Sequence, residues 1–282
     1  MGLAYVEERQ AAIEDRLTEV VERVEPEALS EQMRGVVLAG GKRVRPTLTL
    51  LVCEAADGDV DLALDFAAGV ELVHNASLVV DDIIDRSALR RGSASAWAAH
   101  GHGPAIVTSD GLLGEAFELF AADARATEVV ADALVELGEG EATELVAEPT
   151  NTEEYMDLAR RKTGALFRAA AQLGAVAADA DGETVETVGE YAERVGIAFQ
   201  LRDDVLDATG DADGLGKPTG QDAAMGRPSI LQVTDRTPAE VNELAREEAA
   251  AASAALERLD LEDSEARTYL AELAAFVVER ER

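Results

Sequence analysis

Two aspartate clusters of the same form are the feature that most constrains the fold of this chain. The first cluster is Asp81, Asp82 and Asp85, and the second is Asp203, Asp204 and Asp207. Each follows an apolar run and occupies positions i, i+1 and i+4, which share one side of an α-helix, so both segments are predicted to be helical. Hard divalent cations prefer oxygen ligands, so two such clusters facing each other would form a magnesium clamp for a diphosphate ester.

Acidic motifs arise easily in a chain this acidic. Asp and Glu total 57 of the 282 residues against 25 Lys and Arg, which gives a formal charge of −32. Two DDxxD patterns by accident are nevertheless expected only on the order of once in a hundred such chains. The charge excludes general affinity for nucleic acid or anionic membranes. It suits a protein of a salt-loving organism, because concentrated salt screens the repulsion between the charges.

Helical periodicity runs through almost the whole chain. Alanine is abundant, prolines number seven, and apolar residues recur at spacings of three and four. Thr237, Pro238 and Glu240 predict a capping box, and Asn151 begins another helix in the same style. The longest expected loop spans 210–228. We therefore predict an all-α fold in one domain, residues 1–282, with roughly ten or more helices.

Other features of the sequence bear on where the protein works. Cys53 is the one cysteine, which excludes an internal disulfide and fits a reducing compartment. The N-terminus has no basic start followed by a long apolar core, so no signal peptide is expected. No stretch is expected to reach the length of a membrane span. These features predict a cytoplasmic protein with no transmembrane segment.

The chain has three lysines against 22 arginines, and each lysine stands in an unusual context. Lys42 lies in GGKRVRP, with Arg45 about one helical turn further on. Lys162 precedes Thr163 and a glycine, and Lys217 lies in a glycine-rich loop. Lysine is a compact charge suited to phosphate oxygens, and arginine adds a bidentate fork. The alternative is that each lysine is an ordinary surface residue, which is less favoured for all three together.

Polar residues near the two aspartate clusters are further candidates. Arg90 and Arg91 follow the first cluster and are suited to two different anions, the alternative being simple pairing with those aspartates. His74 lies two helical turns before the first cluster and points roughly the same way. It either donates to a diphosphate or packs as a satisfied core histidine. Gln200 precedes the second cluster and is a candidate polar contact.

These segments resemble the trans-isoprenyl diphosphate synthases, also called the polyprenyl synthetase family. The resemblance runs from about 40 to 228 and rests on GGKRVRP, ELVH, SLVVDDIID, RRG, KTGALF, FQLRDDVLD and GKPTG. It implies an all-α isoprenoid synthase type I fold, with the aspartate clusters on opposite walls of a central cavity, usually in a homodimer. The segment after RRG lacks the Pro-Thr usual in the family, and the late lysine position is Arg227 here.

The resemblance also implies roles for individual residues. Magnesium, about three ions per active site with manganese as a substitute, would be bound by Asp81, Asp82, Asp85, Asp203, Asp204 and Asp207. Isopentenyl diphosphate would be held by Lys42, Arg45, His74 and Arg91. The allylic diphosphate (dimethylallyl, geranyl or farnesyl) would be held by Arg90, Lys162, Thr163, Gln200, Lys217 and Arg227. The residues implied in catalysis are Asp81, Asp82, Asp85, Asp203, Asp204, Lys162, Thr163, Gln200 and Lys217.

The implied reaction is the head-to-tail trans condensation of isopentenyl diphosphate with an allylic diphosphate. Ala76 and Ser77, just before the first cluster, are small, so a shallow floor that stops the product at farnesyl is not expected there. We predict geranylgeranyl (C20) or a longer product, with Phe117 or Phe120 as candidates for a deeper floor.

Two alternatives share parts of this pattern. A class I terpene cyclase normally has an Asn/Ser/Glu metal site where this chain repeats DDxxD. A non-catalytic subunit of a heteromeric synthase would be expected to have lost one aspartate cluster or the anion-binding bases.

Overall fold

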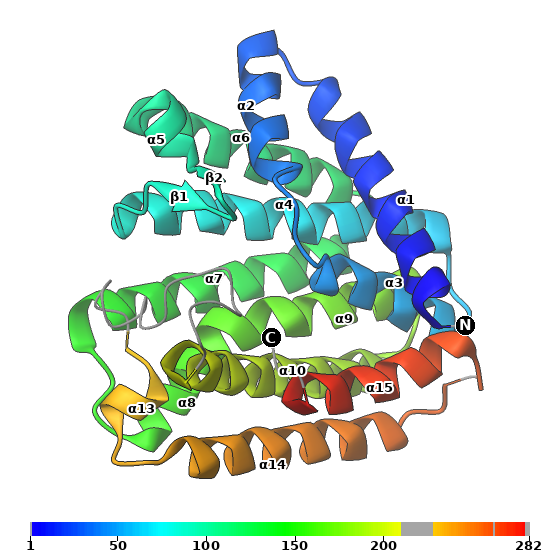
Figure 1. The fold of residues 1–282 in the computed structure, drawn as a ribbon. Helices are drawn as coiled ribbons and strands as arrows, with labels where there is room; N and C mark the ends of the chain where they lie inside the picture. Colours follow the sequence, from blue (N-terminus) through cyan, green and yellow to red (C-terminus); the bar gives the residue numbers. More distant parts are fainter. Residues whose placement is uncertain (1, 210–227, 262, 280–282) are drawn as a thin grey trace. The chain divides into compact units, whose positions relative to one another are not determined.

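The computed structural model describes residues 2–209, 228–261 and 263–279 (Figure 1). Every described element except one short hairpin is helical, so the predicted all-α fold class is confirmed. The chain forms two compact units, residues 1–128 with 173–179 and residues 129–172 with 180–282. A single domain stays a prediction, and the expected loop at 210–228 lies almost wholly outside the described residues.

The first unit is built around one long apolar helix. Its elements are α1 (Gly2–Glu22), α2 (Glu27–Val37), α3 (Val44–Ala55), α4 (Val60–Ile84), β1 (Leu89–Arg90), β2 (Ser93–Ala94), α5 (Ala96–His100) and α6 (His102–Phe120). α7 (Ala124–Ala147) begins in this unit and α9 (Ala165–Ala177) ends in it. α4 packs against α1, α2, α3 and α6, as Figure 1 shows (α4 in cyan).

α4 begins and packs as its sequence dictates. The Asp59 carboxylate caps its first turn by accepting from the backbone N–H of Asp61 at 3.1 Å and of Leu62 at 3.2 Å. Further along, Gly69 leaves room for an aromatic ring, because a Cβ at this position would lie 2.6 Å from the Phe120 ring. The core of the first unit is therefore formed where α6 lies against α4.

α4 is also the one described helix that is long and apolar enough, by length and composition, to cross a membrane. Its most apolar window has a mean hydropathy of 1.3, but 67% of that window is buried inside the protein. The expectation that no stretch reaches this length was therefore wrong for α4. The burial is that of a core helix in a folded domain.

The second unit is organised around α10. Its elements are most of α7 and α9, together with α8 (Thr152–Ala159), the π-helical turn η1 (Arg160–Gly164), α10 (Gly182–Thr209), α13 (Ile230–Val233), α14 (Pro238–Glu257) and α15 (Glu265–Glu279). α10 packs against α14, α15 and η1. The buried Tyr191 hydroxyl of α10 donates to the Leu270 carbonyl at 2.6 Å and ties α15 to this core.

The predicted helix starts in this unit are confirmed. Thr237 and Glu240 form a reciprocal capping box with Pro238 in the first turn of α14. The Asn151 side chain accepts from the Glu154 backbone N–H at 3.0 Å and caps α8. These starts could be predicted because a cap depends on a few neighbouring residues.

Candidate active site

The first aspartate cluster lies at the C-terminal end of α4. Asp82 is buried, and its carboxylate accepts from Arg90 Nε at 3.0 Å and 3.1 Å and from Arg90 Nη2 at 2.6 Å. Asp81 and Asp85 are each partly exposed. The pairing of Arg90 with an aspartate of this cluster, considered above as an alternative, is therefore present. Two of the five N–H donors of a guanidinium serve Asp82 with this geometry, and the others point elsewhere.

A tight hairpin separates the two adjacent arginines. Arg90 is paired with Ser93 in the β1–β2 ladder, and the turn residues Arg91 and Gly92 both have positive φ, at 52° and 80°. Positive φ at both central residues is typical of a type I′ hairpin turn. Arg91 points away from Asp82 and donates to the Gly40 carbonyl. The two arginines thus contact different neighbours, and their binding of two different anions stays a prediction.

A group of basic side chains forms next to this hairpin. Arg45 Nη1 lies 3.3 Å from His74 Nε2. Arginine only donates, so Nε2 accepts and the proton of the neutral ring is on Nδ1. Arg91 packs on the glycine loop that carries Lys42, since a Cβ on Gly41 would lie 2.9 Å from its guanidinium. Arg45, His74 and Arg91 are therefore together.

Burial and mutual repulsion lower the pKa values of His74 and Arg45 in this basic group. Removal from water lowers the pKa of His74 well below 6.5, and Arg45, Arg91, Arg90 and Arg43 lower it further. Burial lowers the pKa of Arg45 to about 10, with Glu71 opposing the shift and Arg91 adding to it. Arg45 still carries its charge at neutral pH, whereas His74 does not. An anion bound here would relieve the repulsion between the charges.

Arg43 anchors the loop that leads into this group. It has a positive φ of 48° and precedes α3, and its side chain is 1% exposed. Its guanidinium donates to Glu14 at 2.5 Å, to Glu71 at 2.6 Å and to the Val37 carbonyl at 2.6 Å. The loop is thereby fastened to α1, α2 and α4 at once.

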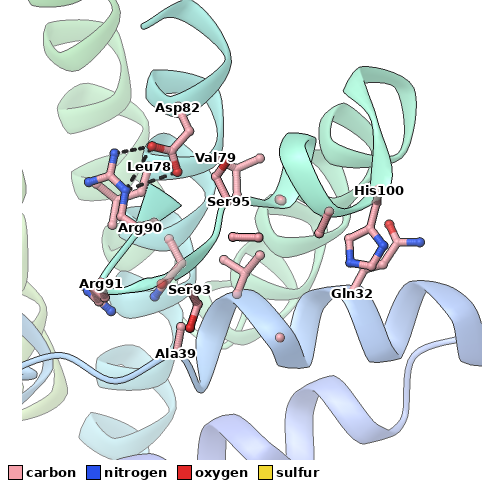
Figure 2. Close-up of a pocket in the computed structure, with 16 residues that line it drawn as sticks. Gln32, Ala39, Leu78, Val79, Asp82, Arg90, Arg91, Ser93, Ser95 and His100 are labelled. Atoms are coloured by element: carbon pink, nitrogen blue, oxygen red, sulfur yellow. Dashed lines mark hydrogen bonds and ion pairs between the residues drawn. The ribbon is translucent and has the colours of Figure 1, made fainter. Parts of the chain in front are cut away.

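A pocket of about 110 Å³ opens beside Asp82 within the first unit (Figure 2). Arg90 and Asp82 lie at one end of it and Gln32 and His100 at the other. Its remaining lining residues are Gly35, Val36, Ala39, Asn75, Leu78, Val79, Arg91, Ser93, Ala94, Ser95, Ala96 and Ala99. Residues 93–96, where the chain lacks the Pro-Thr pair expected after RRG, thus form one wall of this pocket with small side chains.

The two residues predicted to influence product length face different surroundings. Ala76 is buried, and its carbonyl accepts from Ser109 Oγ of α6 at 3.1 Å. The partly exposed Ser77 hydroxyl donates to the His74 carbonyl at 2.9 Å. Phe120 of α6 is fully buried, and its ring lies against Gly69 of α4, two helical turns before Ala76, and 6.1 Å from the ring of Phe66. Bulk is therefore absent at Ala76 and present two turns earlier on α4, where the Phe120 ring of α6 packs against Gly69.

The second aspartate cluster lies in the last turns of α10. Asp204 is buried and accepts from the Tyr155 hydroxyl at 2.5 Å, from Gln200 Nε2 at 2.9 Å and from the Ile230 backbone N–H at 2.9 Å. Asp203 is exposed and Asp207 is partly exposed. Both clusters therefore share one design, in which the middle aspartate is buried and hydrogen-bonded while its neighbours reach the surface.

The π-helical turn η1 positions the other candidates of the second unit. Thr163 Oγ1 donates to Gln200 Oε1 at 2.8 Å, which joins η1 to the hydrogen bonds around Asp204. Lys162 Nζ pairs with Glu141 at 2.7 Å and with Glu144 at 2.6 Å, both on α7. π-Helical turns inside helical segments are frequent at functional sites. Lys217 and Arg227, also predicted to contact a diphosphate, lie outside the described residues.

The donor set suits a hard divalent cation, because both clusters offer carboxylate oxygens and the middle aspartate of each is fixed by neighbouring donors. Within 2–209, 228–261 and 263–279, however, no group of three or more His, Cys, Asp or Glu side chains is arranged to hold an ion on its own. The chemistry of the residues fits magnesium, and the six-aspartate binding set stays a prediction.

Several residues at these sites were not predicted from the sequence. Arg43 stands in the same motif as Lys42 and Arg45, and Glu71 lies one turn before His74, so both had a positional signal. Tyr155, Glu141 and Glu144 had none, because their partners are far away in the sequence and acidic residues are abundant throughout the chain.

Comparison with known proteins supports the class of enzyme that these features indicate. Residues 26–259 match the family described as polyprenyl synthetase. A short chain isoprenyl diphosphate synthase of Methanothermobacter thermautotrophicus is 34% identical, over 95% of each chain. The crystal structure of a geranylgeranyl pyrophosphate synthetase from Pyrococcus horikoshii superposes with a TM-score of 0.91 at 34% identity, covering 99% of this chain and 98% of that one.

A polyprenyl synthase of Caulobacter crescentus, solved in complex with calcium and isoprenyl diphosphate, has a TM-score of 0.88 at 28% identity, over 99% of this chain and 97% of that one. The fold and the site thus define an all-helical enzyme that transfers prenyl groups. The chain belongs to the polyprenyl synthetase family.

Proposed function

We propose that this enzyme condenses isopentenyl diphosphate with an allylic diphosphate, head to tail, and forms geranylgeranyl diphosphate (C20) or a longer product. The observation that carries the proposal is the basic group of Arg45, His74 and Arg91 near the first aspartate cluster. A prenyl synthase needs a site for a second diphosphate, whereas a terpene cyclase needs only one. Clustered cations whose charges lower one another's pKa are suited to such an anion.

The proposed site for isopentenyl diphosphate consists of Lys42, Arg45, His74 and Arg91. Arg45 and Arg91 supply charged donors to the diphosphate. His74 gains a proton or donates through its free ring nitrogen when the anion arrives. Arg43, which stands between Lys42 and Arg45 in the sequence, anchors the segment that carries both through its bonds to Glu14 and Glu71.

The proposed site for the allylic diphosphate consists of Arg90, Lys162, Thr163 and Gln200. Lys217 and Arg227 complete it in this proposal. Divalent cations, with magnesium as the proposed ion, would be bound by the aspartates of both clusters and would stabilise negative charge on the leaving diphosphate. The Caulobacter relative, solved with calcium and isoprenyl diphosphate, supports this pairing of ion and substrate.

In the proposed reaction the carbon–oxygen bond of the allylic diphosphate breaks, and its electron pair leaves with the diphosphate. The double bond of isopentenyl diphosphate attacks the allylic cation and forms the new carbon–carbon bond. A proton is then lost to the departed diphosphate, so no separate protein base is required. The residues of the chain contribute by positioning both substrates and by stabilising the leaving group electrostatically.

The small side chains near the end of α4 support the proposed length of the product. Ala76 and Ser77 place little bulk next to the first aspartate cluster, and the large side chain of Phe120 lies deeper. A longer chain is therefore accommodated before it meets an obstacle. The geranylgeranyl synthetase of Pyrococcus horikoshii, which shares the fold, supports this length.

One experiment separates this function from the alternatives. The enzyme is incubated with farnesyl diphosphate, with and without isopentenyl diphosphate and magnesium, and released diphosphate is measured. We expect release that requires both isopentenyl diphosphate and magnesium. Release from farnesyl diphosphate alone, with formation of a hydrocarbon, would instead indicate a terpene cyclase. Absence of any release would indicate a non-catalytic subunit.

We further propose a cytoplasmic homodimer. α6 exposes Ile106 and Val107 side by side, at 50% and 53% of their surface, which is a surface suited to a second copy. Light scattering at micromolar concentration tests the dimer, and a monomer at all concentrations would contradict it.

A further inference from the structure

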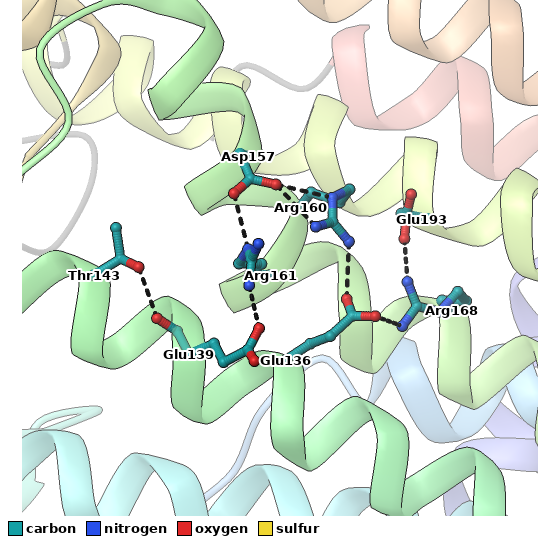
Figure 3. A network of polar contacts seen from close by, with 8 residues as sticks. All are labelled: Glu136, Glu139, Thr143, Asp157, Arg160, Arg161, Arg168 and Glu193. Atoms are coloured by element: carbon teal, nitrogen blue, oxygen red, sulfur yellow. Dashed lines mark hydrogen bonds and ion pairs between the residues drawn. The ribbon is translucent and has the colours of Figure 1, made fainter.

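The basic segment at 160–162 is paired with the acidic face of α7. Arg160 pairs with Glu136 at 2.9 Å, Arg161 pairs with Glu139, and Lys162 pairs with Glu141 and Glu144. Figure 3 shows the part of this network around Arg160 and Arg161, in which Glu136 also binds Arg168 of α9 at 2.7 Å. The π-helical turn is therefore held against one side of α7 by three successive cations.

The ammonium of Lys162 is held by two carboxylates that are both largely sheltered from solvent. Its side chain is 22% exposed, and those of Glu141 and Glu144 are 19% and 14% exposed. Two carboxylates this sheltered hold an ammonium more firmly than surface partners would. Burial alone would lower the pKa of Lys162, but the charges and hydrogen bonds of Glu144 and Glu141 outweigh it and leave the pKa raised.

The backbone brings α7 unusually close to this turn. A Cβ on Gly140 would lie 3.0 Å from both Arg161 Cβ and Lys162 Cγ, and 3.3 Å from the Lys162 backbone nitrogen. A Cβ here would be crowded, so glycine permits this close approach in the middle of a helix that otherwise disfavours it. The close approach lets the Lys162 stem run along α7 to the two carboxylates.

The geometry leaves one donor of the ammonium unassigned among these contacts. An ammonium has three N–H donors and no acceptor. Two of them point to Glu141 Oε2 at 2.7 Å and Glu144 Oε2 at 2.6 Å. With two directions fixed, the third is fixed as well.

We propose that Glu141 and Glu144 are positioning residues that fasten the Lys162 ammonium through two of its N–H groups and aim the third at the allylic diphosphate. This inference rests on the proposed function. A flexible lysine becomes a directed donor, so part of the entropy of ordering it is lost on folding rather than at each turnover. The two glutamates touch no substrate and act through Lys162.

Steady-state kinetics with alanine variants test the inference. Glu144→Ala and Glu141→Ala are each expected to lower kcat/KM for the allylic diphosphate about tenfold while leaving KM for isopentenyl diphosphate unchanged. The isosteric Glu144→Gln keeps an acceptor and is expected to fall in between. The matched control is Glu139→Ala, which removes a carboxylate of the same helix that pairs with Arg161 instead.

A double-mutant cycle separates positioning through Lys162 from a general structural effect. In a Lys162→Ala background, Glu144→Ala should cause no further loss of kcat/KM. An equal loss in both backgrounds, or an equal loss in the Glu139→Ala control, would overturn the inference.

A second readout does not require turnover, so it distinguishes failure of this inference from failure of the proposed function. The chain has three lysines, and trace acetylation with acetic anhydride followed by mass spectrometry reports the reactivity of each. Lys162 should react about tenfold faster in Glu144→Ala than in the wild type, since its free-amine fraction rises as its pKa falls. Unchanged reactivity would overturn the inference, whereas a wild type that forms no prenyl product would overturn the proposed function alone.

Discussion

Burial lowers the pKa of the His74 ring, and the charges of four neighbouring arginines lower it further. In the unfolded chain the same ring has its usual pKa near 6.5. Below that pH the unfolded chain takes up a proton that the folded protein does not, so the folded state loses stability as the pH falls. The contribution is fully present above 6.5 and is lost below it.

The pH dependence of unfolding checks this. Between pH 7 and pH 5 the wild type should lose more unfolding free energy than His74→Gln, by up to about 1.4 kcal/mol per pH unit below 6.5. Guanidinium unfolding at the two pH values measures the difference. Equal losses in the two proteins would show that His74 takes up its proton normally in the fold.

The buried Arg43 makes a second prediction at the same scale. Glu71→Gln removes its buried partner and is expected to cost about 3 kcal/mol of unfolding free energy, because a buried charge loses its counter-ion. Glu14→Gln is the matched control on the same guanidinium. The Glu14 side chain is 39% exposed, so its loss should cost about 1 kcal/mol or less. Equal costs, measured by denaturant unfolding, would contradict the assignment of Arg43 as a buried anchor.

Among single residues, the sequence was most informative where a residue type was rare. Lys42 and Lys162 stood out because the chain has three lysines, and the aspartates stood out through their repeated spacing. The sequence does not distinguish Glu71, Glu141 and Glu144 from the other acidic residues, because the chain has 57 of them. What distinguishes them is a close partner from another helix, and a partner of that kind is visible only in the fold.

At the scale of elements, α4 carries the prediction on product length. Ala76→Phe places a ring next to the first aspartate cluster, about 10 Å along the helix from Gly69 and its contact with Phe120. The main product should shorten by at least one five-carbon unit, as measured by reversed-phase chromatography after dephosphorylation. Ser77→Ala is the matched control and should leave the product unchanged. An unaltered product from a folded Ala76→Phe variant would contradict this role of α4.

Elements were predicted to different degrees. The starts of α8 and α14 follow from local caps, and helical periodicity identified the runs that became α4 and α10. The π-helical turn η1 was not predicted, since one additional residue in a turn leaves no trace in composition or apolar spacing. Its stabilisation comes from α7, where Gly140 permits close contact. Tertiary packing therefore decides the local conformation there.

At the scale of the whole molecule, the formal charge of −32 predicts dependence on salt. Repulsion among the carboxylates opposes folding at low ionic strength and is screened within about 3 Å at 1 M salt. The melting temperature should rise by roughly 5 °C or more between 0.1 M and 2 M potassium chloride. Chloride is chosen because sulfate would also stabilise by exclusion from the surface. An unchanged melting temperature would contradict a fold adapted to salt.

The central claim is that this chain elongates a prenyl diphosphate. The most direct measurement is incubation with radiolabelled isopentenyl diphosphate, magnesium and either farnesyl or dimethylallyl diphosphate, followed by sizing of the dephosphorylated products. We predict label in geranylgeraniol or a longer polyprenol, and none when magnesium is removed. Label that stays entirely in isopentenyl diphosphate would contradict the claim, and a product no longer than farnesol from a dimethylallyl primer would contradict the predicted length.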